Sequence, residues 1–285
     1  MTTVDRYAVA GNPVEHSRSP AIHAMFARQT GQSLEYGRLL CPLDGFAKTL
    51  NQFAQQGALG CNVTVPFKFE AFKLAERRTP RAEMAQAANT LRFDAAEHGG
   101  WLADNTDGLG LVRDITFNAG MPLQGKRILL LGAGGASAGV LGPLMEQGPA
   151  LIVVANRTLV KAQELVARQA RWPRPAGVVL AAASLDEPGE AYDVLINGTA
   201  ASLEGAGVPV SNKTLRPGSL AVDMMYGPTA RGFLEWARAA GAQGRDGLGM
   251  LIEQAAESFA LWRGIRPDTA SVLAAMRQQV DAPPR

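Results

Sequence analysis

One lysine and one carboxylate are the residues of this sequence best suited to proton transfer. Lys68 follows the segment NVTVPF, which ends a predicted strand, and it opens the next predicted helix. The carboxyl ends of parallel strands bind ligands in open α/β sheets, and a lysine is poorly placed for the dipole of a helix's first turn. Asp107 lies in ADNTDG, which contains two carboxylates, Asp104 and Asp107. Capping the helix that follows requires only one carboxylate, so the other is available for chemistry. A free Asp107 would hold the Lys68 amine beside a reacting oxygen. Taken singly, a solvated lysine and a capping cluster are the simpler interpretations.

A pair of serines earlier in the chain suits a polyhydroxylated ligand. Ser17 and Ser19 are separated by one residue in HSRSP, so an extended backbone directs both hydroxyls the same way. Helix capping explains Ser19 with Pro20 at the first helical position, but it leaves Ser17 unexplained. His16 and His23 have no metal-like partner in the sequence, and we interpret both as structural.

The stretch KRILLLGAGGASAG, residues 126–139, is typical of a dinucleotide site. It gives a short buried strand over 128–131, a glycine turn and a small apolar helix over 136–145. Glycines let the backbone approach a pyrophosphate, and the helix start offers unpaired N–H groups. A tight turn without a ligand is the alternative. The turn residues are Gly132, Ala133, Gly134, Gly135 and Ala136.

The strand that follows, 151–155, ends in Asn156, Arg157 and Thr158, at about the distance where a dinucleotide-binding unit meets the adenosine ribose. A carboxylate there would select NAD, whereas a guanidinium can fork onto a 2′-phosphate, so Arg157 favours NADP. Lys161, one helical turn later, would add charge to the same phosphate. The alternative is that both cations are solvated residues opening a surface helix.

Bulk composition describes a globular protein of two domains. The chain has 285 residues, of which 47% are apolar and 19% charged, with a net charge of +2. The basic residues are scattered, which argues against nucleic acid as a partner. No signal peptide and no run of roughly 20 apolar residues is present, so we expect no membrane association. Cys41 and Cys61 form no CxxC pair. We therefore expect a cytoplasmic monomer or homodimer without a bound metal.

The elements that must position these side chains alternate between strand and helix, which predicts an α/β fold. The last predicted helix follows Asp246 and carries Leu251, Ala255 and Phe259 on one side, with Gln254 off that side. Gln254 is therefore either exposed to solvent or turned into a cleft. The other predicted strands cover 7–10, 34–40, 60–65, 178–182, 193–196 and 220–224, and the other predicted helices 21–29, 43–55 and 108–117.

Several motifs in one order make a stronger signal than any of them alone. Through GNPVEHSRSP, CNVTVPFK, ANTL, DNTDG, GAGGAS, NRT, DMMY and DGLGML the chain resembles the shikimate dehydrogenase family over essentially its whole length. The resemblance implies a substrate-binding α/β domain over 1–107, a Rossmann-type NADP domain over 108–246, and C-terminal helices over 247–285 that complete the first domain. It also implies NADPH-dependent, reversible reduction of 3-dehydroshikimate to shikimate, in the route to chorismate and aromatic amino acids.

The resemblance carries roles onto individual residues. Lys68 and Asp107 correspond to the catalytic pair. The substrate ligands that it implies are Ser17, Ser19, Thr64, Asn89, Tyr226 and Gln254. The cofactor ligands that it implies, besides the glycine turn and the Asn156–Thr158 clamp with Lys161, are Met224 and Gly247.

The chain departs from the commonest family pattern at two places. Ala138 stands where many members have arginine, and residues 197–202 read NGTAAS where many read NATSxG. We expect both changes to act on cofactor affinity. Two alternatives remain: a quinate/shikimate dehydrogenase that also uses NAD, and a non-catalytic NADPH-sensing protein on the same fold, which would not need the Lys68–Asp107 pair.

Overall fold

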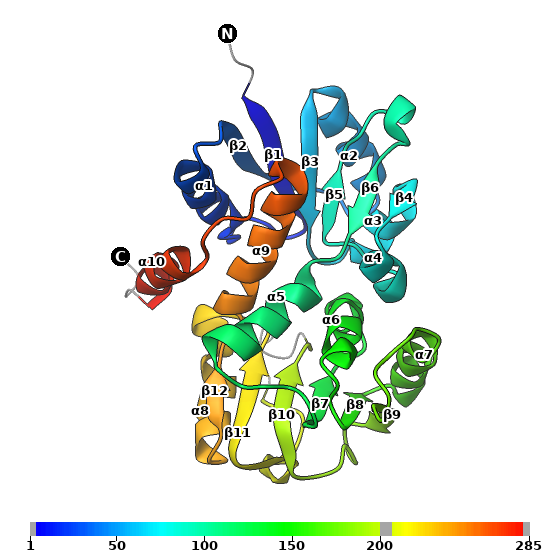
Figure 1. The fold of residues 1–285 in the computed structure, drawn as a ribbon, viewed down its shortest axis with the longest axis vertical. Helices are drawn as coiled ribbons and strands as arrows, with labels where there is room; N and C mark the ends of the chain where they lie inside the picture. The colour runs from blue at the N-terminus through cyan, green and yellow to red at the C-terminus, as the bar shows by residue number, and fades with distance from the viewer. Residues whose placement is uncertain (1–3, 200–206, 282–285) are drawn as a thin grey trace. The chain divides into compact units, whose positions relative to one another are not determined.

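The computed structural model describes residues 4–199 and 207–281 (Figure 1). The chain divides into two compact units, Met1–Gly110 with Ile252–Gln279, and Leu111–Leu251 with Val280–Arg285. Each unit contains one six-stranded sheet, which confirms the predicted α/β fold class. Within the described residues, no helix is both long enough and apolar enough to cross a membrane.

The first unit has a mixed sheet with the strand order β2-β1-β3-β5-β6-β4. β1 pairs in parallel with β2 and β3, whereas β5 is antiparallel to both β3 and β6. The strands are β1 (Asp5–Gly11), β2 (Leu34–Leu40), β3 (Ala58–Val63), β4 (Arg77–Arg78), β5 (Thr90–Arg92) and β6 (Leu102–Asp104). The helices are α1 (Ser19–Thr30), α2 (Phe46–Gln55), α3 (Lys68–Leu74), α4 (Pro80–Ala85), the 3-10 turn η1 (Ala96–His98), and α9 (Leu248–Arg263) from Ile252 onward.

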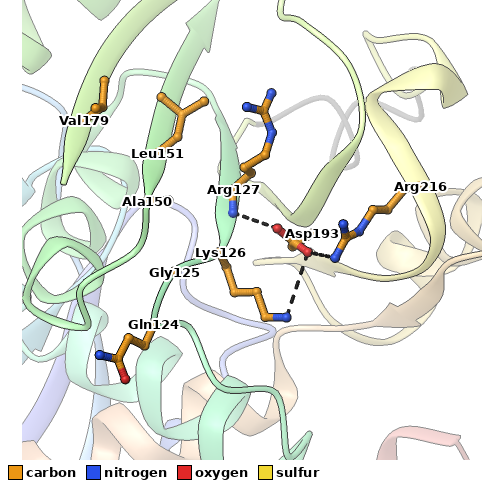
Figure 2. Close-up of a pocket in the computed structure, with 9 residues that line it drawn as sticks. All are labelled: Gln124, Gly125, Lys126, Arg127, Ala150, Leu151, Val179, Asp193 and Arg216. Atoms are coloured by element: carbon orange, nitrogen blue, oxygen red, sulfur yellow. Dashed lines mark hydrogen bonds and ion pairs between the residues drawn. The ribbon is translucent and has the colours of Figure 1, made fainter. Parts of the chain in front are cut away.

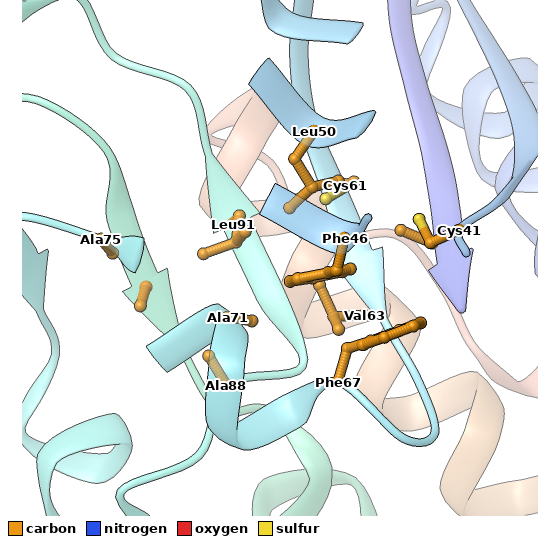
Figure 3. Packing of buried hydrophobic residues seen from close by; sticks show 12 residues of the cluster. Cys41, Phe46, Leu50, Cys61, Val63, Phe67, Ala71, Ala75, Ala88 and Leu91 are labelled. Atoms are coloured by element: carbon orange, nitrogen blue, oxygen red, sulfur yellow. The ribbon is translucent and has the colours of Figure 1, made fainter. Parts of the chain in front are cut away.

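A buried cluster packs α2 and α3 onto this sheet (Figure 3). The ring of Phe67 stacks on that of Phe46 with centroids 4.4 Å apart and an interplanar angle of 10°. Phe67 is 3% exposed and Ala71 is fully buried. Because Phe67 immediately precedes α3, this packing fixes the start of the helix, and with it Lys68.

The second unit has an all-parallel sheet with the order β12-β11-β10-β7-β8-β9. If β7 is taken as the first strand, this order is that of the doubly wound dinucleotide-binding fold. β8 and β9 lie on one side of β7, and β10, β11 and β12 lie on the other, so the direction of winding changes between β7 and β10. The strands are β7 (Arg127–Leu131), β8 (Leu151–Asn156), β9 (Val179–Ser184), β10 (Tyr192–Asn197), β11 (Leu215–Asp223) and β12 (Gln243–Arg245). The helices are α6 (Gly135–Glu146), α7 (Leu159–Gln169) and α8 (Arg231–Ala239), with short turns η3 (Asn212–Thr214) and η4 (Gly227–Ala230). The remaining helix, α10 (Ala270–Asp281), lies largely in the first unit.

The predicted helices differ from the structure at their ends; the helix predicted over 43–55, for example, begins at Phe46, and two further differences bear on the site. The helix predicted over 108–117 is α5 (Asp107–Arg113) followed by a π-helical turn η2 (Asp114–Asn118). In α1 the helix begins at Ser19, and its N-cap position, Arg18, makes no side-chain capping hydrogen bond. The prediction of Ser19 as the cap was therefore wrong, and its hydroxyl is not engaged in capping α1.

Candidate active site

Lys68 and Asp107 meet in the first unit. The Nζ atom of Lys68 lies 2.5 Å from Oδ2 of Asp107, and their side chains are only 16% and 7% exposed. A buried carboxylate with a charged hydrogen bond holds the ammonium group in one position. The ammonium group can therefore donate a proton to an oxygen placed next to it, as the sequence pattern indicated.

Backbone hydrogen bonds fix Lys68 relative to the strand that carries its neighbours. The N–H of Ala88 donates to the Lys68 carbonyl oxygen at 2.8 Å. The next residue, Asn89, accepts from the N–H of Val63 at 2.7 Å and donates its own N–H to Asp104 at 3.1 Å. The start of α3, the end of β3 and the end of β6 are thus joined at one point, beside the Lys68–Asp107 pair.

The polar residues of ADNTDG do not all cap the following helix, which was the simpler interpretation of this cluster. Asp104 is fully buried and accepts hydrogen bonds from Thr79 Oγ1 and Arg81 Nε, both at 2.6 Å. The side chain of Asn105 accepts from the Asp107 N–H at 3.2 Å. Asp104 is therefore bound to a structural arginine and Asn105 serves the helix start, so the Asp107 carboxylate faces Lys68.

Asn89 is the centre of the polar cluster around this pair. Its Nδ2 donates to Asp107 Oδ1 at 2.8 Å and to Gln254 Oε1 at 2.9 Å, and it lies 2.9 Å from Thr106 Oγ1. Its Oδ1 accepts from the Thr106 N–H at 2.9 Å. Gln254 on α9 is 8% exposed, so it is not a solvent-facing residue. The structure thus brings four of the predicted residues, Lys68, Asn89, Asp107 and Gln254, into one buried hydrogen-bonded group.

A second layer of polar residues supports Asn89, and sequence reasoning did not select it. Asn62 Nδ2 donates to Thr90 Oγ1 at 3.1 Å and to Ser258 Oγ at 2.9 Å. Thr90 also donates to Asn89 Oδ1 at 2.9 Å. The available signal was Asn62, a polar residue inside an apolar strand pattern, since a buried amide needs partners.

The remaining predicted substrate ligands of this unit lie at the starts and ends of neighbouring elements. Ser19 is 5% exposed, and the half-buried Ser17 accepts from the Ser19 N–H at 3.3 Å. Thr64 is half-buried directly after β3, and its N–H donates to the Ala10 carbonyl at 2.9 Å. A Cβ on Gly11 would lie 2.4 Å from the Thr64 methyl group, so only glycine fits beside it. Gly11 and Thr64 lie at the ends of β1 and β3, the edge where Lys68 also begins α3.

An aromatic cluster lies behind these ligands. Tyr36 donates its hydroxyl to Asn62 Oδ1 at 2.7 Å, and burial raises the pKa of this phenol well above its usual value, while a hydrogen bond with Ser19 opposes the rise. The His23 ring stacks on Tyr36 with centroids 4.1 Å apart and planes at 4°. His23 is fully buried, consistent with the predicted structural role.

His23 makes stability depend on pH. Burial lowers the pKa of His23 from 6.5 to about 3, and Asn62 opposes this only in part. Between these values the unfolded chain binds the extra proton, so the free energy of unfolding falls as the pH decreases from 6.5 toward 3. The slope contributed by this residue approaches about 1.4 kcal/mol per pH unit. Denaturant unfolding of His23→Phe at a series of pH values is expected to show a flatter profile, whereas exposed His98→Gln keeps the wild-type slope. Parallel profiles for His23→Phe and wild type would contradict this assignment.

In the second unit the glycine turn has the geometry that a phosphate cradle requires. Gly132 follows β7 with a φ of +98°, in a region that L side chains rarely adopt, and a Cβ there would lie 3.1 Å from the Gly198 carbonyl oxygen. Gly134 is the N-cap of α6, has no side-chain capping bond, and is exposed with open space around it. Ser137 Oγ is buried and has no hydrogen-bond partner among the described residues. Open backbone at a helix start fits a pyrophosphate.

The ribose side of the predicted cofactor site lies at the end of β8. Asn156 is half-buried and donates its side-chain amide to the Thr158 carbonyl at 2.9 Å. Arg157, Thr158 and Lys161 are exposed around the start of α7. Two exposed cations at a helix N-terminus suit a 2′-phosphate, since the helix dipole adds to their charge.

The predicted nicotinamide-side residues meet at the ends of β10 and β11. A Cβ on Gly247 would lie 2.4 Å from the Met224 carbonyl oxygen, so glycine is required there. The Met224 N–H donates to the Asn197 carbonyl at 3.0 Å. Tyr226 is half-buried at the N-cap of η4, and it belongs to the second unit.

The two departures from the family pattern lie in different surroundings. Ala138 is 1% exposed inside α6, so it packs in the interior of this unit. In the stretch 197–202, the Asn197 side chain accepts from the Thr199 hydroxyl at 2.7 Å. Residues 200–202 lie outside the described residues. The predicted effects of both changes on cofactor affinity stay predictions.

Comparison with known proteins gives one consistent result. A sequence model for the shikimate dehydrogenase substrate binding domain matches residues 9–91, one for shikimate / quinate 5-dehydrogenase matches 115–206, and one for the shikimate 5'-dehydrogenase C-terminal domain matches 247–277. A shikimate dehydrogenase (NADP(+)) of Methylibium petroleiphilum is 63% identical over 97% of this chain and 95% of the relative. The crystal structure of an Ael1 enzyme from Pseudomonas putida is 44% identical with a TM-score of 0.86, covering 98% and 99% of the two chains. Shikimate 5-dehydrogenase from Thermus thermophilus, in complex with NADP(H) and shikimate, is 31% identical with a TM-score of 0.83 over 96% and 99%.

A doubly wound unit with a glycine turn and an arginine after its second strand, together with a partly buried lysine–carboxylate pair in a separate α/β unit, is typical of a dinucleotide-dependent oxidoreductase. The three matching sequence models and the relative at 63% identity specify the family of oxidoreductase to which the chain belongs. The chain belongs to the shikimate dehydrogenase family.

Proposed function

We propose that Lys68 and Asp107 form the catalytic pair for the reversible NADPH-dependent reduction of 3-dehydroshikimate to shikimate. The observation that carries this proposal is the 2.5 Å contact between Lys68 Nζ and Asp107 Oδ2 inside the buried group centred on Asn89. A protein that only sensed NADPH would not need a partly buried ammonium group paired with a carboxylate in the unit that lacks the glycine turn.

The chemical step divides between the cofactor and the protein. NADPH supplies the hydride that adds to the carbonyl carbon. Negative charge then develops on the carbonyl oxygen, and the Lys68 ammonium donates a proton to it; in the oxidative direction the amine accepts that proton back. Asp107 holds Lys68 in place and accepts from a neighbouring ring hydroxyl. Asn89 and Gln254 fix the Asp107 carboxylate and present further polar atoms to the ring.

We assign the rest of the substrate by the chemistry of its groups. Ser17 and Ser19 supply two hydroxyl donors for the substrate carboxylate, and the Ser19 hydroxyl, which does not cap α1, hydrogen-bonds with the Tyr36 side chain in the absence of substrate. Thr64 and Tyr226 supply further hydroxyls for the ring. The first unit is accordingly proposed as the substrate-binding domain and the second as the NADP domain.

Arg157 is expected to determine cofactor choice. An exposed guanidinium beside the start of α7 is free to pair with the 2′-phosphate of NADP, and NAD lacks that group. Replacing Arg157 by alanine is expected to raise KM for NADP about 10- to 100-fold, with KM for shikimate and activity with NAD little changed. Arg171→Ala removes an exposed arginine beyond the other end of α7 and serves as the control. A KM for NADP that stays at the wild-type value would contradict the assignment.

The function as a whole is tested by following reduction of the nicotinamide cofactor with shikimate and quinate, each tried with NADP and NAD. Activity confined to shikimate with NADP is the expected result. Comparable turnover of quinate would place the chain among broader quinate/shikimate enzymes, and cofactor binding without turnover in any mixture would support the sensor.

We place the reaction in the cytoplasm, where thiols stay reduced, because both cysteines are buried free thiols. No structural feature described above requires a second subunit, and a monomer or a homodimer would serve the proposed chemistry equally.

A further inference from the structure

The second unit has a pocket that is separate from the proposed cofactor site. It lies at the amino-terminal ends of β7, β8 and β9 and has a volume of about 670 Å³, within the range of small-molecule sites (Figure 2). The glycine turn follows the carboxyl end of β7, and five residues of strand separate the two ends by roughly 15 Å. A smaller pocket of about 330 Å³ shares Lys126, Asp193 and Arg216 with it.

The charges around this pocket do not balance. Three cationic residues line it, Lys126, Arg127 and Arg216, against the single carboxylate of Asp193. Arg216 pairs with Asp193, and Lys126 Nζ stands 3.9 Å from the same oxygen, Oδ1. Figure 2 shows Lys126 and Arg216 both directed at this carboxylate. Asp193 thus holds two cations close together but neutralises only one, and an added anion would relieve their repulsion.

The backbone is shaped to bring these groups together. The side chain of Asp193 is 8% exposed, and its Oδ2 accepts from the Arg127 N–H at 2.8 Å. The register between β10 and β11 shifts here: Tyr192 pairs with Leu215 and Val194 pairs with Leu220, so an advance of two residues along β10 matches an advance of five along β11. The extra residues form a bulge that carries Arg216 to Asp193. Bulges re-aim side chains and are favoured next to functional sites.

The last residue of this bulge, Ser219, has a buried hydroxyl without a hydrogen-bond partner among the described residues. Ser219 lines the smaller pocket and is 2% exposed. A buried hydroxyl without a partner is costly, and a ligand oxygen would satisfy it. Apolar side chains complete the walls, with Leu151 and Val179 in the larger pocket and Met121 in the smaller one.

We propose that the two adjoining pockets, which share Lys126, Asp193 and Arg216, together bind one phosphate monoester. The phosphoryl group pairs with Lys126 and Arg216 and accepts from the Ser219 hydroxyl, while the carbon part of the ester lies against Leu151 and Val179. Arg127 contributes only its charge, because its guanidinium sits over the Tyr192 ring at 5.3 Å. A phosphoryl group, which carries close to two negative charges at neutral pH, matches the excess of cations better than a single carboxylate.

Calorimetric titration of the full chain with phenyl phosphate, in the presence of saturating NADP, tests the proposal. Saturable binding is expected, tighter than that of inorganic phosphate because only the ester reaches the apolar wall. Lys126→Gln and Arg216→Gln are each expected to weaken it about tenfold, and Ser219→Ala about fivefold. Lys126→Gln is the more informative variant, since the Asp193–Arg216 pair remains intact in it.

Arg238→Gln, which removes an exposed arginine of α8, is the matched control and should bind as wild type does. Binding that is lost in Arg157→Ala but kept in Lys126→Gln would assign the phosphate to the cofactor site and overturn the proposal. The absence of saturable binding, or equal affinity for phenyl phosphate and inorganic phosphate, would overturn it too.

Discussion

Replacing Lys68 by alanine is expected to lower kcat for shikimate oxidation by about 10²- to 10⁴-fold, the usual contribution of a positioned general acid or base. Lys68 is the cation in direct contact with Asp107 and begins α3 at the edge where the predicted ligands of the first unit lie. Without its amine, the reacting hydroxyl loses the positioned base that takes its proton. NADP binding should stay unchanged, because the glycine turn and Arg157 belong to the other unit.

Steady-state kinetics and a separate NADP titration measure the two quantities. Lys73→Ala, an exposed lysine on the same helix, is the matched control and should retain wild-type kcat. Removal of Lys68 leaves Asp107 buried at 7% exposure without its cation, so a loss of stability is also expected, and the unfolding midpoint must be measured beside the kinetics. An equal loss of kcat and of NADP affinity in a folded variant would show that the assigned role is wrong.

The sequence predicted the fold class and most of the strands because parallel strands are short apolar runs bounded by glycine and polar residues. The predicted strand over 34–40 coincides with β2, and the predicted strand over 128–131 lacks only Arg127 of β7. β5 and β6 were not predicted, since three residues carry no alternating pattern. These two antiparallel strands flank Asn89 and Asp107, so the part of the sheet that positions the site was the part that periodicity could not detect.

The site was predicted as a set of residue types and not as a set of contacts. Asn89 and Gln254 hydrogen-bond across a separation of 165 residues, which no local pattern encodes. Thr90 and Ser258 look like ordinary members of a strand and a helix, yet their hydroxyls are 2.7 Å apart beneath Asn89. The capping interpretation is correct only in part: the cluster over 104–107 and Ser19 both fit local capping statistics, and Asn105 does accept from the N–H of Asp107. Asp104, however, is bound by Arg81, and Ser19 is not the N-cap of α1.

Replacing Asp107 by asparagine should lower kcat by about 10²-fold and raise KM for shikimate, because Asp107 both positions Lys68 and binds the substrate. The change keeps the side-chain shape and the space beside Asn89, so the fold should be retained. Asp44→Asn removes an exposed carboxylate of the same unit and should leave both constants unchanged. Unaltered kcat in Asp107→Asn would mean that Lys68 needs no anionic partner.

The kcat of the combined variant Lys68→Ala/Asp107→Asn tests whether the two residues act as one catalytic unit or contribute independently. Residues that act as a unit lose most of their effect with the first substitution, so the double variant should be little slower than Lys68→Ala alone. If the two residues contributed separately, their losses would multiply to about 10⁴-fold or more. Near-equality of kcat in the single and double variants would mean that the 2.5 Å contact is part of the catalytic step, because Asp107 then affects kcat only through the amine it holds, while its substrate contact is measured separately by KM. Multiplying losses would leave Asp107 as a substrate ligand whose contact with Lys68 is incidental to proton transfer.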